Sequence, residues 1–170
     1  MTRFTIKNLE SEDRSGFDSG TPELDEYLKQ RARQDIRRRI SGCYIAVDPS
    51  SAMIAGYYTI SACHVRLTDL PDAWRKKLPR YPNIPAVLVG RLAVDRRFRG
   101  RKIGSGLIVD AATRSMRAEV VVNLMVVDAK DDAATRFYRH HGFVENPDNP
   151  KQLFVPLKRI VDALQESGKI

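Results

Sequence analysis

A basic turn rich in glycine, at residues 96–106, has the clearest chemical potential in this chain. It follows an apolar run at 87–94 that is typical of a buried strand, and it leads into the apolar residues 107–112, which we expect to be helical. The N–H groups at a helix start are unpaired and carry partial positive charge, and glycine lets an anion approach them. The turn therefore predicts a phosphate site, with glycines Gly100, Gly104 and Gly106 and cations Arg99, Arg101 and Lys102.

This turn has neither of the two commonest phosphate-loop patterns. It lacks G-x-x-x-x-G-K-S/T, which argues against a nucleoside triphosphate loop, and it lacks G-x-G-x-x-G, which argues against a dinucleotide fold. Residues 101–106, RKIGSG, instead fit a pattern of Gln or Arg, two residues, Gly, one residue, and Gly or Ala. Taken alone, so short a pattern is explained equally well by a basic turn that only caps a helix.

A second motif lies at residues 131–143, where an acidic start and a late glycine bracket an expected helix at 132–141. Both features are favourable at those helix ends. Phe137, Tyr138, Gly142 and Phe143 stand in the order F-Y-x-x-x-G-F, and an expected strand at 120–127 separates this motif from the first. Together, the two motifs resemble the pyrophosphate loop and the following helix of the GNAT acetyltransferase superfamily.

The GNAT resemblance implies a fold and a set of binding residues. The fold would be α/β (α+β), one GNAT domain over residues 1–170, with a single mixed twisted sheet of about six or seven strands flanked by helices. The donor would be acetyl-CoA, with no metal, and Tyr138 would be the catalytic acid that protonates the departing sulfur. The residues implied at the donor are Leu92, Ala93, Val94, Arg99, Gly100, Arg101, Lys102, Ile103, Gly104, Ser105, Gly106 and Phe137.

Three further stretches, at 17–28, 78–85 and 90–95, resemble one subfamily, the GNAT toxins of bacterial toxin–antitoxin modules (TacT type). This resemblance implies acetylation of the α-amine of aminoacyl-tRNA, which would block translation. It also implies a ribbon-helix-helix antitoxin as partner and a homodimer. Ser19 departs from the subfamily, which often has cysteine at this position, and we expect the position to be structural.

The charge balance points independently toward a polyanion. Twenty-nine Lys and Arg against 21 Asp and Glu give a net charge of +8, more than a coenzyme A site needs. A tRNA substrate fits this surplus, although solubility or an acidic protein partner would explain it too. The candidate RNA contacts are Arg33, Arg37, Arg38, Arg75, Lys76, Lys77 and Arg91.

Each RNA candidate also has an ordinary structural explanation. The arginines near 33–39 could form a solvated helix face, and Trp74 and Tyr81, among the cations at 75–80, could stack on RNA or anchor their segment to the core. Arg91 stands inside an apolar run, so its charge must reach an edge or a cleft.

Periodicity and turn signals predict the order of elements. We expect strands at 4–9, 43–47, 52–62, 87–94, 120–127 and 152–157. We expect helices at 22–39, from about 70 or 71 to 78, and at 104–117, 132–141 and 157–165. The first helix should bury a stripe made of Leu24, Tyr27, Leu28, Ala32 and Ile36. Residues 64–85 should otherwise be irregular.

The proposed chemistry needs a neutral amine and an acid for the departing thiolate. A free α-amine titrates near pH 8 and an adjacent ester lowers that value, so no strong general base is required. Tyr138 could alternatively be a packed aromatic, and His140 and His141 are weak candidates for a base because they point away from Tyr138 on a helix. Cys43 and Cys63 have no metal spacing and are expected to have packing roles.

The sequence has no run long and apolar enough for a membrane span and no secretory signal at residues 1–13, so we expect a cytoplasmic protein. Two rival functions stay open at this point. One is a GNAT enzyme that acetylates a protein amine, a polyamine or an antibiotic. The other is a GNAT-like module that binds RNA or a partner without catalysis. Observed turnover of acetyl-CoA would exclude this second rival.

Overall fold

A computed structural model describes residues 3–167 and contains one mixed sheet of seven strands in the order β1-β2-β3-β4-β5-β7-β6. The pairs β1–β2, β2–β3, β5–β7 and β6–β7 are antiparallel, and β4–β5 is parallel. The strands are β1 (Thr5–Asn8), β2 (Gly42–Val47), β3 (Ile54–Arg66), β4 (Asn83–Val94), β5 (Leu124–Asp128), β6 (Val144–Asn146) and β7 (Asn149–Pro156). The expected α/β fold is confirmed.

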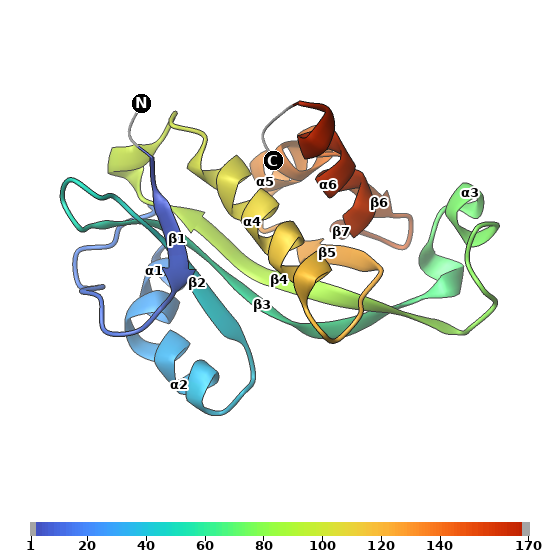
Figure 1. Cartoon of the computed structure of the whole chain (residues 1–170), viewed down its shortest axis with the longest axis horizontal. Coiled ribbons are helices and arrows are strands. Elements are labelled where there is room, and N and C mark those ends of the chain that lie inside the picture. The colour runs from blue at the N-terminus through green and yellow to red at the C-terminus, as the bar shows by residue number, and fades with distance from the viewer. Residues whose placement is uncertain (1–2, 168–170) are drawn as a thin grey trace. The chain divides into compact units, whose positions relative to one another are not determined.

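The helices are α1 (Pro22–Glu26), the π-helix η1 (Tyr27–Arg31), α2 (Ala32–Arg37), the short η2 (Leu67–Asp69), α3 (Asp72–Arg75), η3 (Arg96–Phe98), α4 (Ile103–Arg117), α5 (Asp132–His140) and α6 (Leu157–Glu166) (Figure 1). None of these helices, within residues 3–167, could cross a membrane by length and apolarity. The described chain divides into two compact units, residues 3–61 with 90–111 and residues 62–89 with 112–167. β3 and β4 each pass from one unit into the other.

In the first unit, the helical segment α1–η1–α2 covers one face of the strands. Tyr27, Leu28 and Ala32 are buried together with core residues of β2, β3 and β4, so the predicted apolar stripe is confirmed. The continuous helix predicted over 22–39 is corrected in two respects. A π-turn interrupts it at Tyr27–Arg31, and it ends at Arg37, before Arg39 adopts a left-handed φ of 58°.

The opposite face of the first unit carries the start of α4. A Cβ on Gly56 of β3 would lie 2.9 Å from the carbonyl oxygen of Ala93 and 3.1 Å from Leu107 Cδ1, so only glycine allows this close approach. Tyr58 donates a hydrogen bond of 2.7 Å to Asp110 Oδ2 and ties α4 to β3. These contacts fix the helix whose N-terminus follows the basic turn.

In the second unit, one core cluster joins β3, β4, β5 and β7 to the segment 67–78. Val65 and Ile84 belong to that core, so the predicted irregular segment 64–85 is wrong at both ends, where β3 and β4 continue. α3 is shorter than the helix predicted at 71–78. Val120 and Val121 are 75% and 80% exposed and precede β5, so the strand predicted at 120–127 begins only at Leu124.

Candidate active site

Asp95 is the hub of the loop that follows β4. It caps η3 by accepting a hydrogen bond of 2.9 Å from the N–H of Arg97, and it accepts another of 3.0 Å from the N–H of Asp18. The Arg97 guanidinium adds contacts of 2.9 and 2.7 Å. Burial opposes the charge on this fully enclosed carboxylate, but these donors outweigh burial and hold the pKa of Asp95 below its ordinary value.

Three arginines of the basic turn hold the segment 16–20 in place. Arg96 pairs with Asp18, Arg97 donates to the carbonyl of Gly16 at 2.8 Å, and Arg99 donates to the carbonyl of Ser19 at 2.7 Å. The predicted phosphate partner Arg99 therefore already has a partner in the chain. Sequence reasoning missed the roles of Asp18 and Asp95, although a carboxylate directly after a strand and before a turn is a typical cap signal.

Residues 100–106 have the backbone geometry of an anion cradle. Gly100 and Lys102 adopt left-handed φ values of 79° and 59°, a conformation that gathers successive N–H groups into a concavity. A Cβ built on Gly100 or on Gly106 would meet open space. α4 then begins at Ile103 with no acidic residue in its first turn. The loop thus fits a phosphate group through N–H groups, a helix N-terminus and the exposed cations Arg101 and Lys102.

The end of β4 offers backbone groups beside this loop. The parallel ladder joins Ala86–Val89 to Leu124–Val127, and within the described residues β4 continues past that ladder to Val94. Leu92, Ala93 and Val94 lie in the continuing part. A strand end of this kind is able to pair with an extended ligand by adding one more strand.

Tyr138, in the second unit, has a buried ring and a hydroxyl without a partner among the described residues. The ring is 6% exposed and makes edge contacts with Phe137 and Phe143 at 5.2 and 5.4 Å between centroids. Among residues 3–167 only Asp48 Oδ1 is a fully buried side-chain polar atom without a partner, so the Tyr138 oxygen keeps some accessible surface. Burial, and then the charge of Asp128, raise the pKa of Tyr138 well above 10.0, which keeps its proton at neutral pH.

The surroundings of His141, Cys43 and Cys63 do not favour a role as base or nucleophile. His141 Nδ1 lies 2.9 Å from the carbonyl oxygen of Phe137. Burial raises the pKa of the Cys43 thiol to about 12 and also raises that of Cys63, so neither favours a thiolate. The described residues contain no cluster of His, Cys, Asp or Glu able to hold a metal ion.

The candidate RNA contacts divide between the two units. In the first unit, Arg33, Arg37 and Arg38 are exposed on and after α2, and Arg91 is half-buried. In the second unit, Lys76 and Lys77 are exposed, and Arg75 pairs with Asp72.

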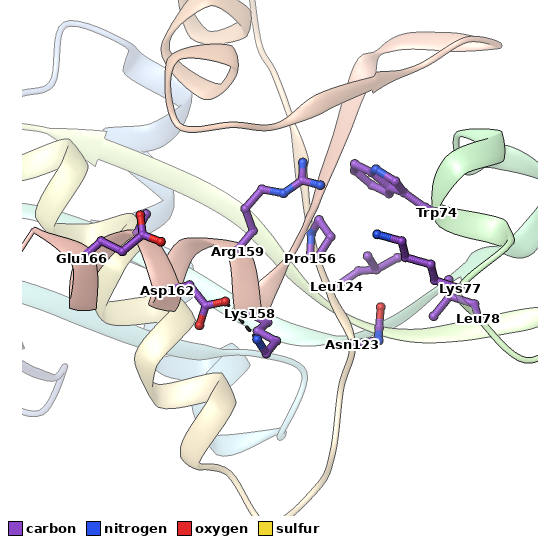
Figure 2. A pocket seen from close by; sticks show the side chains of 11 residues that line it. Trp74, Lys77, Leu78, Asn123, Leu124, Pro156, Lys158, Arg159, Asp162 and Glu166 are labelled. Atoms are coloured by element: carbon purple, nitrogen blue, oxygen red, sulfur yellow. Dashed lines mark hydrogen bonds and ion pairs between the residues drawn. The ribbon is translucent and has the colours of Figure 1, made fainter.

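Trp74 lines a pocket of about 640 Å³ in the second unit, between α3 and α6 (Figure 2). Its ring makes an edge contact with Phe154 at 5.9 Å and lies 5.2 Å from the guanidinium carbon of Arg159. Lys77, Leu78, Leu124 and Pro156 also line the pocket, and Lys158 pairs with Asp162 at 3.0 Å. These contacts anchor Trp74 to the core, which is one of the two explanations that the sequence left open.

Comparison with known proteins gives matches over most of the chain. Residues 43–145 match the family described as acetyltransferase (GNAT) domain. The chain is 33% identical over 151 residues to the tRNA-acetylating toxin of Mycobacterium tuberculosis, covering 88% of this chain and 89% of that protein.

Two solved structures are similar to the whole chain. AtaT complexed with acetyl-methionyl-tRNAfMet is 30% identical with a TM-score of 0.84, covering 95% of this chain and 99% of AtaT. A tyrosine-to-phenylalanine mutant of AtaT, bound to the C-terminus of the antitoxin AtaR, is 28% identical with a TM-score of 0.78, covering 94% and 97%. With its matched domain and its mixed seven-stranded sheet, this chain belongs to the GNAT acetyltransferase family.

Proposed function

We propose that this protein transfers the acetyl group of acetyl-CoA to the α-amine of aminoacyl-tRNA and thereby stops translation. The observation that carries the proposal is the likeness to AtaT, which was solved with acetyl-methionyl-tRNAfMet and matches 95% of this chain at a TM-score of 0.84. An acetylated α-amine is no longer a nucleophile, so an acetylated aminoacyl-tRNA cannot take part in peptide-bond formation as an acceptor.

The donor, acetyl-CoA, supplies the acetyl group as a thioester. The N–H groups of the loop at 100–106, with Arg101 and Lys102, would hold its pyrophosphate. Backbone groups of Leu92, Ala93 and Val94 would pair with its pantetheine arm, and Phe137 would lie beside it. Arg99, by holding Ser19, keeps the loop in shape, and it adds positive charge without being the main phosphate ligand.

Tyr138 would donate a proton to the sulfur as the thioester breaks. Its raised pKa keeps the hydroxyl protonated, its buried ring fixes the position of the oxygen, and that oxygen keeps some accessible surface. The attacking amine loses its proton to solvent, because the ester lowers its pKa toward neutrality and no strong base is needed.

The positive charge of the protein would attract the RNA substrate. The net charge of +8 gives attraction to phosphates, and the exposed cations at Arg33, Arg37, Arg38, Lys76 and Lys77 are available for contact. Arg75, paired with Asp72, would contribute less than its exposed neighbours.

The partner we propose is an antitoxin, which the complex of AtaT with the C-terminus of AtaR supports. We further propose that this antitoxin has a ribbon-helix-helix DNA-binding part, that the protein forms a homodimer, and that it acts in the cytoplasm, where charged tRNA is found.

The direct test is transfer of labelled acetyl from acetyl-CoA to total charged tRNA, followed by nuclease digestion and identification of the labelled aminoacyl adenosines. Acetyl on the α-amine would support the proposal. Turnover of acetyl-CoA with a polyamine or a protein, without label on charged tRNA, would replace it by another acetyltransferase activity.

A further inference from the structure

Arg91 is a half-buried cation that the protein leaves without a charged partner. Its guanidinium carbon lies 3.6 Å from the centre of the Tyr27 ring, and within residues 3–167 it makes no hydrogen bond or ion pair. A guanidinium has five N–H donors in a fixed fork, and partial burial deprives them of water. Stacking on a ring supports the plane of the group but leaves those donors available to an acceptor from outside.

The ring under Arg91 is held from several sides. Tyr27 is 4% exposed and stacks on Tyr57 with 6.4 Å between centroids and 15° between planes. Its hydroxyl donates to Asp35 Oδ2 at 2.7 Å and lies 3.3 Å from Ser41 Oγ. The platform therefore exists before any ligand arrives, so a ligand of Arg91 would meet a preorganised donor.

The π-turn that begins at Tyr27 is built into the fold by side chains from outside it. The Tyr57 hydroxyl donates to the carbonyl of Leu24 at 2.6 Å, and Arg14 donates to the carbonyl of Leu28 at 3.0 Å. These bonds satisfy carbonyls around the widened turn, where regular helical pairing is interrupted. Turns of this kind occur often at functional sites, and this one sets the position of the ring that carries Arg91.

A cavity of about 230 Å³ opens at this pair of residues. It is lined by Glu23, Leu24, Glu26, Tyr27, Arg31 and Arg91. Arg31 brings a second guanidinium to the same cavity. The carboxylates of Glu23 and Glu26 repel an anion from their own edge, so the favourable position for a single anionic group is beside the two arginines.

We propose that Arg91, seated on Tyr27, binds a phosphate of the single-stranded 3′ end of the RNA substrate, an inference that rests on the proposed function. Arg91 directly precedes Leu92–Val94, the strand end that would hold the donor arm, so its ligand lies near the reacting groups. In aminoacyl-tRNA the phosphate nearest the α-amine is separated from it by only the ester and the terminal ribose. A stacked guanidinium suits a phosphate because it donates two parallel hydrogen bonds in one plane, which two phosphate oxygens accept.

The test is direct binding of an uncharged, fluorescein-labelled tRNA minihelix ending in CCA, titrated at several salt concentrations. We expect Arg91→Gln to weaken binding about tenfold and to lower the log–log salt slope by about 0.7, the value for one single-stranded phosphate. The affinity of Arg91→Lys should lie between those of wild type and Arg91→Gln, because lysine keeps the charge but loses the forked pair of donors. The affinity for acetyl-CoA should not change.

Two variants of Tyr27 test whether its ring positions Arg91. Tyr27→Phe keeps the ring and should bind the minihelix nearly as wild type, whereas Tyr27→Leu should resemble Arg91→Gln. An unchanged salt slope in Arg91→Gln would overturn the inference, as would an equal loss of acetyl-CoA affinity. If Arg91→Gln does not fold, the affinity of Arg91→Lys for the minihelix decides instead, with Tyr27→Phe as control, and wild-type affinity in Arg91→Lys would overturn the inference.

This assay involves no acetyl transfer, so its outcome can be distinguished from that of the test of the proposed function. Minihelix binding that depends on Arg91, together with no labelling of charged tRNA, would refute the activity and keep the phosphate site. Labelling of charged tRNA with a salt slope that does not depend on Arg91 would do the reverse.

Discussion

At the scale of single residues, Tyr138 combines two properties that rarely occur together in a packed aromatic. Its ring contacts Phe137 and Phe143, yet its hydroxyl makes no hydrogen bond within the described residues and is not fully buried. A hydroxyl that served only packing would be expected to find a partner. This missing partner agrees with our proposal that the hydroxyl donates its proton to the departing sulfur.

We expect Tyr138→Phe to lower kcat for acetyl transfer by about 10²- to 10³-fold, because general acid catalysis contributes on this order. The affinity for acetyl-CoA and the melting temperature should stay near wild type, since the ring is kept. Steady-state kinetics, equilibrium binding and thermal unfolding measure these three quantities. A mutant with wild-type kcat would remove Tyr138 from the chemistry and leave it a packing residue.

The pH profile gives a second check on the same residue. Burial raises the pKa of Tyr138 above its ordinary value of 10.0, so the acid stays protonated throughout the neutral range. We expect log kcat/KM to rise with pH as the substrate amine loses its proton and then to stay level up to about pH 10. A fall between pH 7 and 9 would contradict a tyrosine acid and would indicate a group with a lower pKa.

At the scale of elements, the turn after β4 and the segment 16–20 form one unit through Asp95. This carboxylate is fully buried and accepts four hydrogen bonds, from Asp18 and Arg97. The anion cradle of α4 follows directly, so the order of that cradle depends on a residue that would not contact the ligand.

We expect Asp95→Asn to lower the free energy of unfolding by about 2 kcal/mol, because a charged acceptor and its ion pair are lost. Acetyl-CoA should also bind more weakly. Asp162→Asn, which breaks only the exposed pair with Lys158, is the matched control and should change stability little. Denaturant unfolding measures the stability of both variants. Equal stabilities of Asp95→Asn and wild type would contradict a central role for Asp95.

Asp95 also predicts a direction for acid unfolding. The pKa of Asp95 is below its ordinary value of 3.8, so its charge stabilises the folded state above that pH, and the contribution is lost as pH falls through the lowered pKa. The difference in stability between wild type and Asp95→Asn should therefore be constant from neutral pH down to about pH 4 and should shrink below it.

Local patterns predicted α4, α5 and the apolar stripe of α1–η1–α2, because each depends on residues within one or two turns. The local patterns failed where contacts with residues distant in the sequence determine the structure. The π-turn depends on Tyr57 and Arg14, the length of β3 and β4 depends on the core around Val65 and Ile84, and Val120 and Val121 have strand propensity but no strand to pair with in the described structure. The two motifs were recognisable from sequence, and Asp95 carries a cap signal, whereas its contact with Asp18 joins residues 77 positions apart and was not recognisable.

At the scale of the whole molecule, the net charge of +8 should govern the encounter with RNA. We expect KM for charged tRNA to rise steeply with salt, whereas KM for acetyl-CoA changes much less, since fewer phosphates are involved.

The double change Lys76→Ala and Lys77→Ala should lower the salt slope for tRNA by about 1 to 2 while leaving kcat unchanged. Lys158→Ala, which removes a cation already paired with Asp162, is a charge-matched comparison for one lysine. Equal slopes in the double variant and wild type would exclude the α3 segment from the RNA contact.

The pocket between α3 and α6 has one practical consequence. Trp74 is the single tryptophan of the chain, and it stands in the wall of that pocket within 5.2 Å of the Arg159 guanidinium (Figure 2). Light absorbed in the indole band is therefore emitted from this one location. Its intensity and wavelength should follow whatever displaces Arg159 or enters the pocket, so the unlabelled protein contains its own optical reporter for the second unit.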